Sequence, residues 1–81
     1  MRYVSTRGRA APLGFQDVVI AGLADDGGLF VPERIPDVRA QLDSWRGLPF
    51  TELAARVMAQ FVDDIPHAVL RELLQRSYAS F

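Results

Sequence analysis

The segment GLADDGGLFVPERIP, residues 22–36, leaves one apolar run and enters another within a few residues. Two aspartates and two glycines stand at its centre, and Leu29, Phe30 and Val31 follow them directly. Such a segment either holds a ligand with its backbone or turns the chain so that the flanking apolar segments can meet. In the first case the segment is a binding site, and in the second it is a structural turn.

The residues around the glycines favour the turn. A phosphate-binding glycine loop follows a strand and opens a helix, with the pattern GxGxxG or GxxxxGK[ST]. Gly27 and Gly28 instead follow a helical pattern and open a strand, so their N–H groups do not lie at a helix N-terminus. Asp25 and Asp26 have no second acidic cluster at metal-ligand spacing, which favours a solvated turn over a metal site. We therefore predict that Asp26, Gly27 and Gly28 form a structural turn.

The first half of the chain is predicted to run strand, helix, turn, strand. Residues 3–6 are short, β-branched and aromatic, as in a strand, and residues 7–14 contain the glycines and proline of a loop. Apolar residues at positions 15, 18, 19 and 23 have helical spacing, which predicts a helix from Phe15 to about Ala24. A second strand is predicted at residues 29–31, after the turn.

The second half is predicted to be helical. A first helix spans residues 37–46, with apolar side chains at positions 38, 42 and 45. A second, strongly amphipathic helix spans residues 50–62. Two aspartates and a proline at positions 63–66 separate it from a last helix with the same rhythm, which reaches Phe81. The expected fold class is therefore α+β, a small cap of two short strands and about four helices.

Composition excludes several classes of function. The 81 residues allow one domain, and a chain that is 49% hydrophobic at this size is expected to expose part of its apolar surface to a partner. All nine basic residues are arginines, scattered along a chain of net charge −1, so no nucleic-acid partner is expected. The absence of cysteine excludes disulfides and thiolate sites, and no apolar run is long enough for a membrane span. We expect a cytoplasmic protein with no membrane partner.

Few residues are candidates for chemistry. His67 is the only histidine, and we interpret it as an exposed residue in the first turn of the last helix. Arg7 and Arg9 form a loop pair that could bind an anion, although two solvated charges are the favoured interpretation. Glu52 and Arg56 have the i, i+4 spacing of an ordinary ion pair on a helix surface. We predict no catalytic, cofactor-binding or metal-binding residue in this chain.

The last two helices carry more large apolar side chains than a small core can hold. The last helical pattern also reaches position 81 without a stop signal, which is expected either if the sequence was cut there or if the natural chain continues. We predict a domain interface, or self-association of the isolated chain, through these side chains. The expected interface residues are Phe61, Leu73, Leu74, Tyr78 and Phe81.

Four segments together resemble the beginning of the threonine synthases. These are YVSTRG at residues 3–8, FQDVVIAGLADDGGLFVPERIP at residues 15–36, LPFTELAARVMAQFV at residues 48–62 and IPHAVLRELLQRSYASF at residues 65–81. The most specific part is residues 22–32, which match a family pattern of Gly-Leu, a polar pair, then Gly-Gly-Leu-aromatic-Val-Pro. The resemblance covers the whole chain and depends on the order and spacing of the segments.

The resemblance implies the N-terminal domain of a fold-type II pyridoxal-phosphate enzyme that converts O-phospho-L-homoserine and water to L-threonine and phosphate. In that family the lysine that binds the cofactor lies beyond the matched region, in agreement with the absence of lysine here. No catalytic residue carries over, so the 81 residues alone are expected to be inactive and to bind no cofactor. The implied partners are the remaining domains of the same enzyme.

Two alternatives stay open at this point. One is a free-standing, non-catalytic interaction module, and the other is a threonine-synthase-like phospholyase with a different substrate. The sequence downstream of Phe81 separates them, because a lysine motif there supports the enzymes and a stop codon supports the module.

Overall fold

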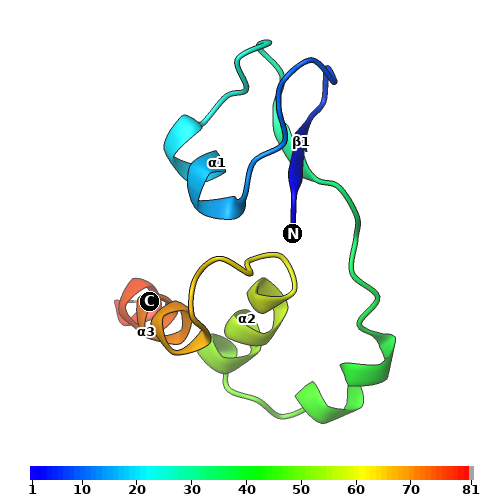
Figure 1. The fold of residues 1–81 in the computed structure, drawn as a ribbon. Helices are drawn as coiled ribbons and strands as arrows, with labels where there is room; N and C mark the ends of the chain where they lie inside the picture. The colour runs from blue at the N-terminus through cyan, green and yellow to red at the C-terminus, as the bar shows by residue number, and fades with distance from the viewer. Residues whose placement is uncertain (81) are drawn as a thin grey trace. The chain divides into compact units, whose positions relative to one another are not determined.

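The computed structural model describes residues 1–80, and it divides into two compact units that meet at residues 35 and 36. The first unit contains strand β1 (Tyr3–Ser5), helix α1 (Phe15–Ala21) and strand β2 (Phe30–Pro32) (Figure 1). The second contains two 3-10 turns, η1 (Arg39–Gln41) and η2 (Asp43–Trp45), followed by helices α2 (Phe50–Ala59) and α3 (His67–Tyr78). The predicted α+β class is confirmed.

The first unit is built on an antiparallel pair of short strands. Tyr3 lies opposite Pro32, and Ser5 lies opposite Phe30, so these side chains share one face of the pair. The ring of Phe15, the first residue of α1, lies 6.0 Å from that of Tyr3. The segment between β1 and α1 also bonds to the strand, because the N–H of each of Tyr3 and Leu13 donates to the carbonyl of the other.

Helix α1 ends three residues earlier than predicted. Gly22 has φ of +72°, in the left-handed region that favours glycine, and its N–H donates to the carbonyl of Val18. Ala24, the predicted last residue, is buried beyond the helix, where its N–H donates to the carbonyl of Gly28. The turn therefore begins at Gly22, before the two aspartates. The helix was predicted too long because the apolar pattern continues to Leu23.

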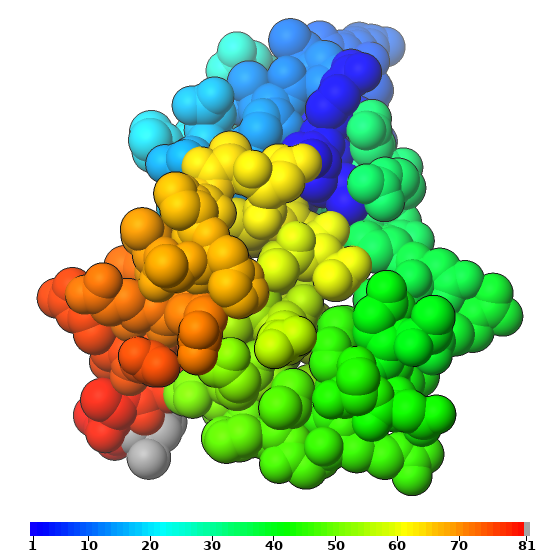
Figure 2. Space-filling model, turned by 60° about the horizontal axis from the view of Figure 1, so that its bottom comes forward, coloured from blue at the N-terminus to red at the C-terminus, as the bar shows by residue number. Residues whose placement is uncertain are grey.

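The second unit is an antiparallel pair of helices with its own core. Figure 2 shows α3, in orange to red, directly against α2 in yellow-green. Phe50 starts α2 and Tyr78 ends α3, and their rings meet edge to face at 5.0 Å, which identifies the antiparallel arrangement. Ala55 is fully buried, so its small side chain lets the two helices approach closely. The buried apolar residues of this unit are Trp45, Ala55, Val62, Leu70 and Leu74.

The helix predicted over residues 37–46 was wrong. This segment forms η1 and η2, separated by Leu42, and Trp45 is the one residue of these turns that is buried. A short helix is unstable unless tertiary packing supports it, and one buried side chain gives little support. The Asp37 carboxylate also bonds the backbone N–H and the guanidinium of Arg39, which favours a local turn.

Two further details of the helices differ from expectation. Helix α2 ends at Ala59 rather than position 62, because the N–H groups of Phe61 and Val62 both donate to the Met58 carbonyl and close the chain into a turn. Glu52 accepts a 2.9 Å hydrogen bond from Arg71 of α3 rather than pairing with Arg56. Helix α3 ends at Tyr78, so the predicted extension is wrong at residues 79 and 80, and Phe81 lies outside the described residues. No helix of residues 1–80 is long and apolar enough to cross a membrane.

Candidate functional site

The main polar cluster of the first unit joins the end of β1 to the turn before β2. Ser5, Thr6 and Arg7 lie on one side, and residues 26–29 lie on the other. The antiparallel register sets Ser5 opposite Phe30, which brings the residues after β1 beside those before β2. We call the group formed by Ser5, Thr6, Arg7, Asp26 and Gly28 the turn cluster.

The carboxylate of Asp26 is the centre of the turn cluster. It accepts hydrogen bonds from Ser5 Oγ at 2.7 and 2.8 Å, from the Gly28 N–H at 2.9 Å and from the Arg9 N–H at 2.9 Å. The Nη1 atom of Arg7 donates to the Asp26 carbonyl at 2.9 Å. One aspartate thus satisfies donors from two loops that lie far apart in the sequence.

Thr6 adds a second connection between the same two segments. Its backbone N–H donates to the Leu29 carbonyl at 2.8 Å, and its Oγ1 accepts from the Leu29 N–H at 3.0 Å. The Arg7 N–H donates to Ser5 Oγ at 3.1 Å. Each residue of the Ser-Thr-Arg sequence therefore has a separate role in holding the turn.

Both glycines of the turn are required by geometry, for different reasons. Gly27 has φ of +82°, which other residues rarely adopt, and a Cβ there would lie 2.6 Å from Arg7 Nη1. Gly28 has no positive φ, but a Cβ there would overlap Ser5 Oγ and lie 3.1 Å from the backbone nitrogen of Arg7. Gly28 is thus fixed by the close approach of the two segments.

The hydrogen bonds of the cluster lower the pKa of Asp26 below its ordinary value of 3.8. The largest cause is the bond from Ser5, followed by the bond from the Gly28 N–H; the Arg9 N–H and the charge of Arg7 act in the same direction. These donors stabilise the ionised form, so Asp26 stays charged to a lower pH than an ordinary aspartate does.

The interpretation of Asp26 as a solvated turn residue needs correction. Its carboxylate is half-buried and bonded by three different residues, whereas Asp25 is exposed. Sequence reasoning also missed Ser5 and Thr6 as members of the cluster. The available signal was two hydroxyl residues at the end of a predicted strand, opposite the start of its predicted partner.

Arg7 and Arg9, the candidate anion-binding pair, are brought together with Asp26 around an open hollow. The Arg7 guanidinium donates to the Asp26 carbonyl, and the Arg9 N–H donates to its carboxylate. Asp26 therefore already takes donors from both residues. Anion binding by the pair stays a prediction, and a second anion would share this hollow with a carboxylate.

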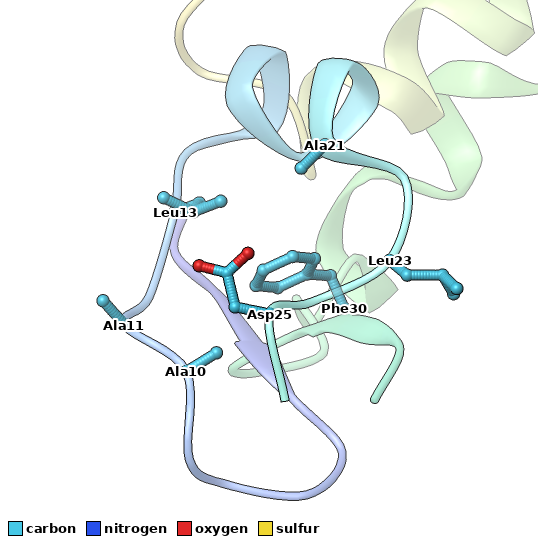
Figure 3. Close-up of a pocket in the computed structure, with 7 residues that line it drawn as sticks. All are labelled: Ala10, Ala11, Leu13, Ala21, Leu23, Asp25 and Phe30. Carbon is cyan, nitrogen blue, oxygen red and sulfur yellow. The ribbon is translucent and has the colours of Figure 1, made fainter. Parts of the chain in front are cut away.

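A smaller hollow lies between α1, β2 and the segment before α1 (Figure 3). Its volume is about 80 Å³, well below the several hundred Å³ typical of small-molecule sites. The Phe30 ring lies among the lining residues with the Asp25 carboxylate nearby, and Leu23 points away from them. The hollow is lined by Ala10, Ala11, Leu13, Ala21, Leu23, Asp25 and Phe30.

The predicted interface residues have different environments. Leu73 is 45% exposed, whereas Leu74 is only 7% exposed and belongs to the core of the second unit. We therefore leave Leu74 out of the expected interface. Phe61 and Tyr78 are half-buried, with Tyr78 against Phe50, and Phe81 lies outside the described residues.

The last features to consider are His67 and possible metal ligands. His67 is the exposed first residue of α3, as predicted. Over residues 1–80, no group of three or more histidine, cysteine, aspartate or glutamate side chains could hold a metal ion.

Comparison with known proteins identifies the class to which this chain belongs. Residues 2–78 match the family described as "Threonine synthase N terminus". A threonine synthase of Pseudomonas aeruginosa is 51% identical over 83 residues, covering all of this chain and 18% of that protein. A threonine synthase of Methylobacillus glycogenes is 39% identical over 79 residues, covering 96% of this chain and 17% of that protein.

A solved structure agrees with these sequences. The crystal structure of threonine synthase from Brucella melitensis with bound pyridoxal phosphate matches with a TM-score of 0.93 and 41% identity, over all of this chain and 18% of that one. The chain belongs to the threonine synthase N-terminal family. It spans about a fifth of the length of the relatives it matches.

Proposed function

We propose that this chain is the N-terminal domain of a pyridoxal-phosphate-dependent threonine synthase. The complete enzyme is a carbon–oxygen lyase of the cytoplasm that converts O-phospho-L-homoserine and water to L-threonine and phosphate. The observation that carries the proposal is 51% identity to a threonine synthase over the entire chain. The shared fold and the match to the N-terminal family support it.

The residues of this chain do not fit the cofactor. Covalent attachment of pyridoxal phosphate needs a lysine amine, and the sequence contains none. The hollow of about 80 Å³ beside α1 is also too small for the cofactor and a substrate, and the larger open hollow at Arg7 and Arg9 has the Asp26 carboxylate in its lining. In this proposal the cofactor and O-phospho-L-homoserine bind the remaining domains, and the present domain contributes structure.

A domain exchange tests this function. Residues 1–81 replace the matching N-terminal segment of the Pseudomonas aeruginosa enzyme, and phosphate release from O-phospho-L-homoserine is measured. We predict that the chimera is active and that the 81-residue chain alone, mixed with pyridoxal phosphate, releases no phosphate. Turnover by the isolated chain would contradict the proposed division of roles.

The two alternatives give different results. A free-standing interaction module predicts an inactive chimera and a stop codon directly after Phe81. A phospholyase of different specificity predicts a lysine motif downstream in the same reading frame, in an enzyme that prefers another phosphorylated hydroxy-amino acid over O-phospho-L-homoserine. Assay of that complete enzyme with both substrates decides between the phospholyase and threonine synthase.

A further inference from the structure

The first unit exposes more large apolar side chains than it buries. Among residues 1–35, only Tyr3 and Ala24 are apolar and buried. The exposed large apolar residues of this unit are Val19, Ile20, Leu23, Leu29, Val31 and Ile35. An exposed apolar set of this size in so short a segment is typical of a surface that another part of a protein covers.

Helix α1 is the element least supported by the unit itself. It has seven residues and none of them is buried. An isolated helix of this length is unstable in water, because the few hydrogen bonds it forms do not offset the cost of nucleation. The contact of Phe15 with Tyr3 and the glycine at its C-terminus support only its two ends.

Three of the exposed residues lie on this helix or just after its end. Val19 and Ile20 lie in its last turn and Leu23 follows two residues after its end, with exposed fractions of 62%, 84% and 61%. The segment from Val18 to Leu23 contains no charged residue. We call Val19, Ile20 and Leu23 the α1 apolar face.

We propose that the α1 apolar face is a docking surface for the larger part of threonine synthase that follows this segment in its relatives. The inference rests on the proposed function. The matched relatives continue for about four-fifths of their length outside this domain, so a large covalently linked partner is implied. A covalent link gives a high effective concentration, at which a small apolar contact is sufficient.

The size of the face argues against a second copy of this chain. Stable complexes between separate proteins bury roughly 1,200–2,000 Å² in total, whereas domains of one chain associate over about 600–1,500 Å². Two side chains on a short helix and one just after it can form part of a contact of the second kind, together with other exposed residues. They are too few to hold a dimer alone.

Hydrogen exchange in the active chimera tests the docking surface. Ile20→Glu introduces a charge at the most exposed residue of the face. The matched control is Ile35→Glu, at a residue of the same type that is 77% exposed and lies outside α1. We expect Ile20→Glu to increase the amide exchange rate of residues 15–21 in the chimera about tenfold or more, and Ile35→Glu to leave it unchanged.

The same measurement on the 81-residue chain shows how Ile20→Glu changes amide exchange when the larger domains are absent. We expect Ile20→Glu to leave exchange in that chain unchanged, because the face is exposed there and glutamate is a good helix former. Equal exchange in the Ile20→Glu and Ile35→Glu chimeras, or the same increase in the isolated chain, would overturn the docking proposal.

Other outcomes identify a different failure. A discrete dimer of the 81-residue chain that Ile20→Glu abolishes, measured by sedimentation velocity, would assign the face to a second copy and also overturn the proposal. An unsubstituted chimera without activity would refute the proposed function, and the docking inference with it. If the chimera is active and Ile20→Glu does not change its amide exchange, the docking proposal is refuted and the proposed function is not.

Discussion

At the scale of single residues, the turn cluster explains why two distant sequence segments occur together. The Ser-Thr-Arg sequence, which begins with the last residue of β1, forms hydrogen bonds with the segment from Asp26 to Leu29 before β2. The two segments also constrain each other sterically, because Ser5 Oγ occupies the space that a side chain at position 28 would need. The aspartate therefore has a structural role that its position in a turn alone did not indicate.

The two kinds of glycine constraint can be separated by substitution. We predict that Gly27→Ala and Gly28→Ala each destabilise the fold by about 1 kcal/mol or more. Gly8→Ala is the control, because Gly8 has φ of +74° and nothing within 4 Å of the added Cβ. The free energy of unfolding in urea measures the three costs. A loss for Gly28→Ala below that for Gly8→Ala would show that Ser5 moves aside without strain.

Because Asp26 accepts several hydrogen bonds, its substitution should destabilise the fold more than substitution of Asp25. We expect Asp26→Ala to lower the melting temperature more than Asp25→Ala, since removal of the carboxylate leaves Ser5 Oγ and two backbone N–H groups without their acceptor. Thermal unfolding followed by circular dichroism measures both variants. Equal melting temperatures would return Asp26 to the role of a solvated turn residue.

The same carboxylate predicts a dependence of stability on pH. The folded-state pKa of Asp26 lies below its ordinary value of 3.8, so its contribution is complete above that value and is lost as pH falls through the folded pKa. We expect the difference in unfolding free energy between the natural chain and Asp26→Asn to be constant near neutrality and to shrink below about pH 4. A difference that persists unchanged to pH 2 would show that the charge of Asp26 is unimportant.

At the scale of elements, the sequence predicted those features that depend on long periodic patterns. Helices α2 and α3 have apolar residues repeated over several turns, and both are present within a few residues of their predicted bounds. The helix predicted before them failed because its pattern was short and only Trp45 found a buried place. The turn cluster could not be predicted in full, since its bonds depend on the register of the two strands, and its partners Ser5 and Asp26 lie 21 residues apart along the chain.

In the pair formed by α2 and α3, we expect apolar burial to contribute more to stability than the ion pair between the helices. Leu70 of α3 is buried in the core of the second unit, so we expect Leu70→Ala to destabilise that unit by about 2–5 kcal/mol. Glu52→Gln removes the ion pair with Arg71 and should cost less than about 1 kcal/mol, because the pair is partly exposed to solvent. Denaturation followed by the fluorescence of Trp45, the only tryptophan, reports on this unit. A larger loss for Glu52→Gln would contradict the dominance of apolar burial.

At the scale of the whole molecule, the described residues expose more apolar side chains than they bury. Eleven large apolar residues are exposed, including Phe50 and Leu73 in the second unit, and seven apolar residues are buried. A free-standing domain of this size normally has a larger share of its apolar surface in a core. The imbalance agrees with relatives in which this segment is about a fifth of a larger protein.

This imbalance predicts how the isolated chain behaves in solution. Burial of one large apolar side chain contributes roughly 1.5–3 kcal/mol, so several exposed ones favour association. We predict that the 81-residue chain binds a hydrophobic fluorescent dye and associates weakly and non-specifically as its concentration rises, measured by light scattering. The chimera, in which the larger domains cover part of this surface, should bind less dye per molecule. A monomeric, dye-silent chain at high concentration would mean that the two units close their own cores. In that case the free-standing module would account better for the fold than a domain that depends on a larger enzyme.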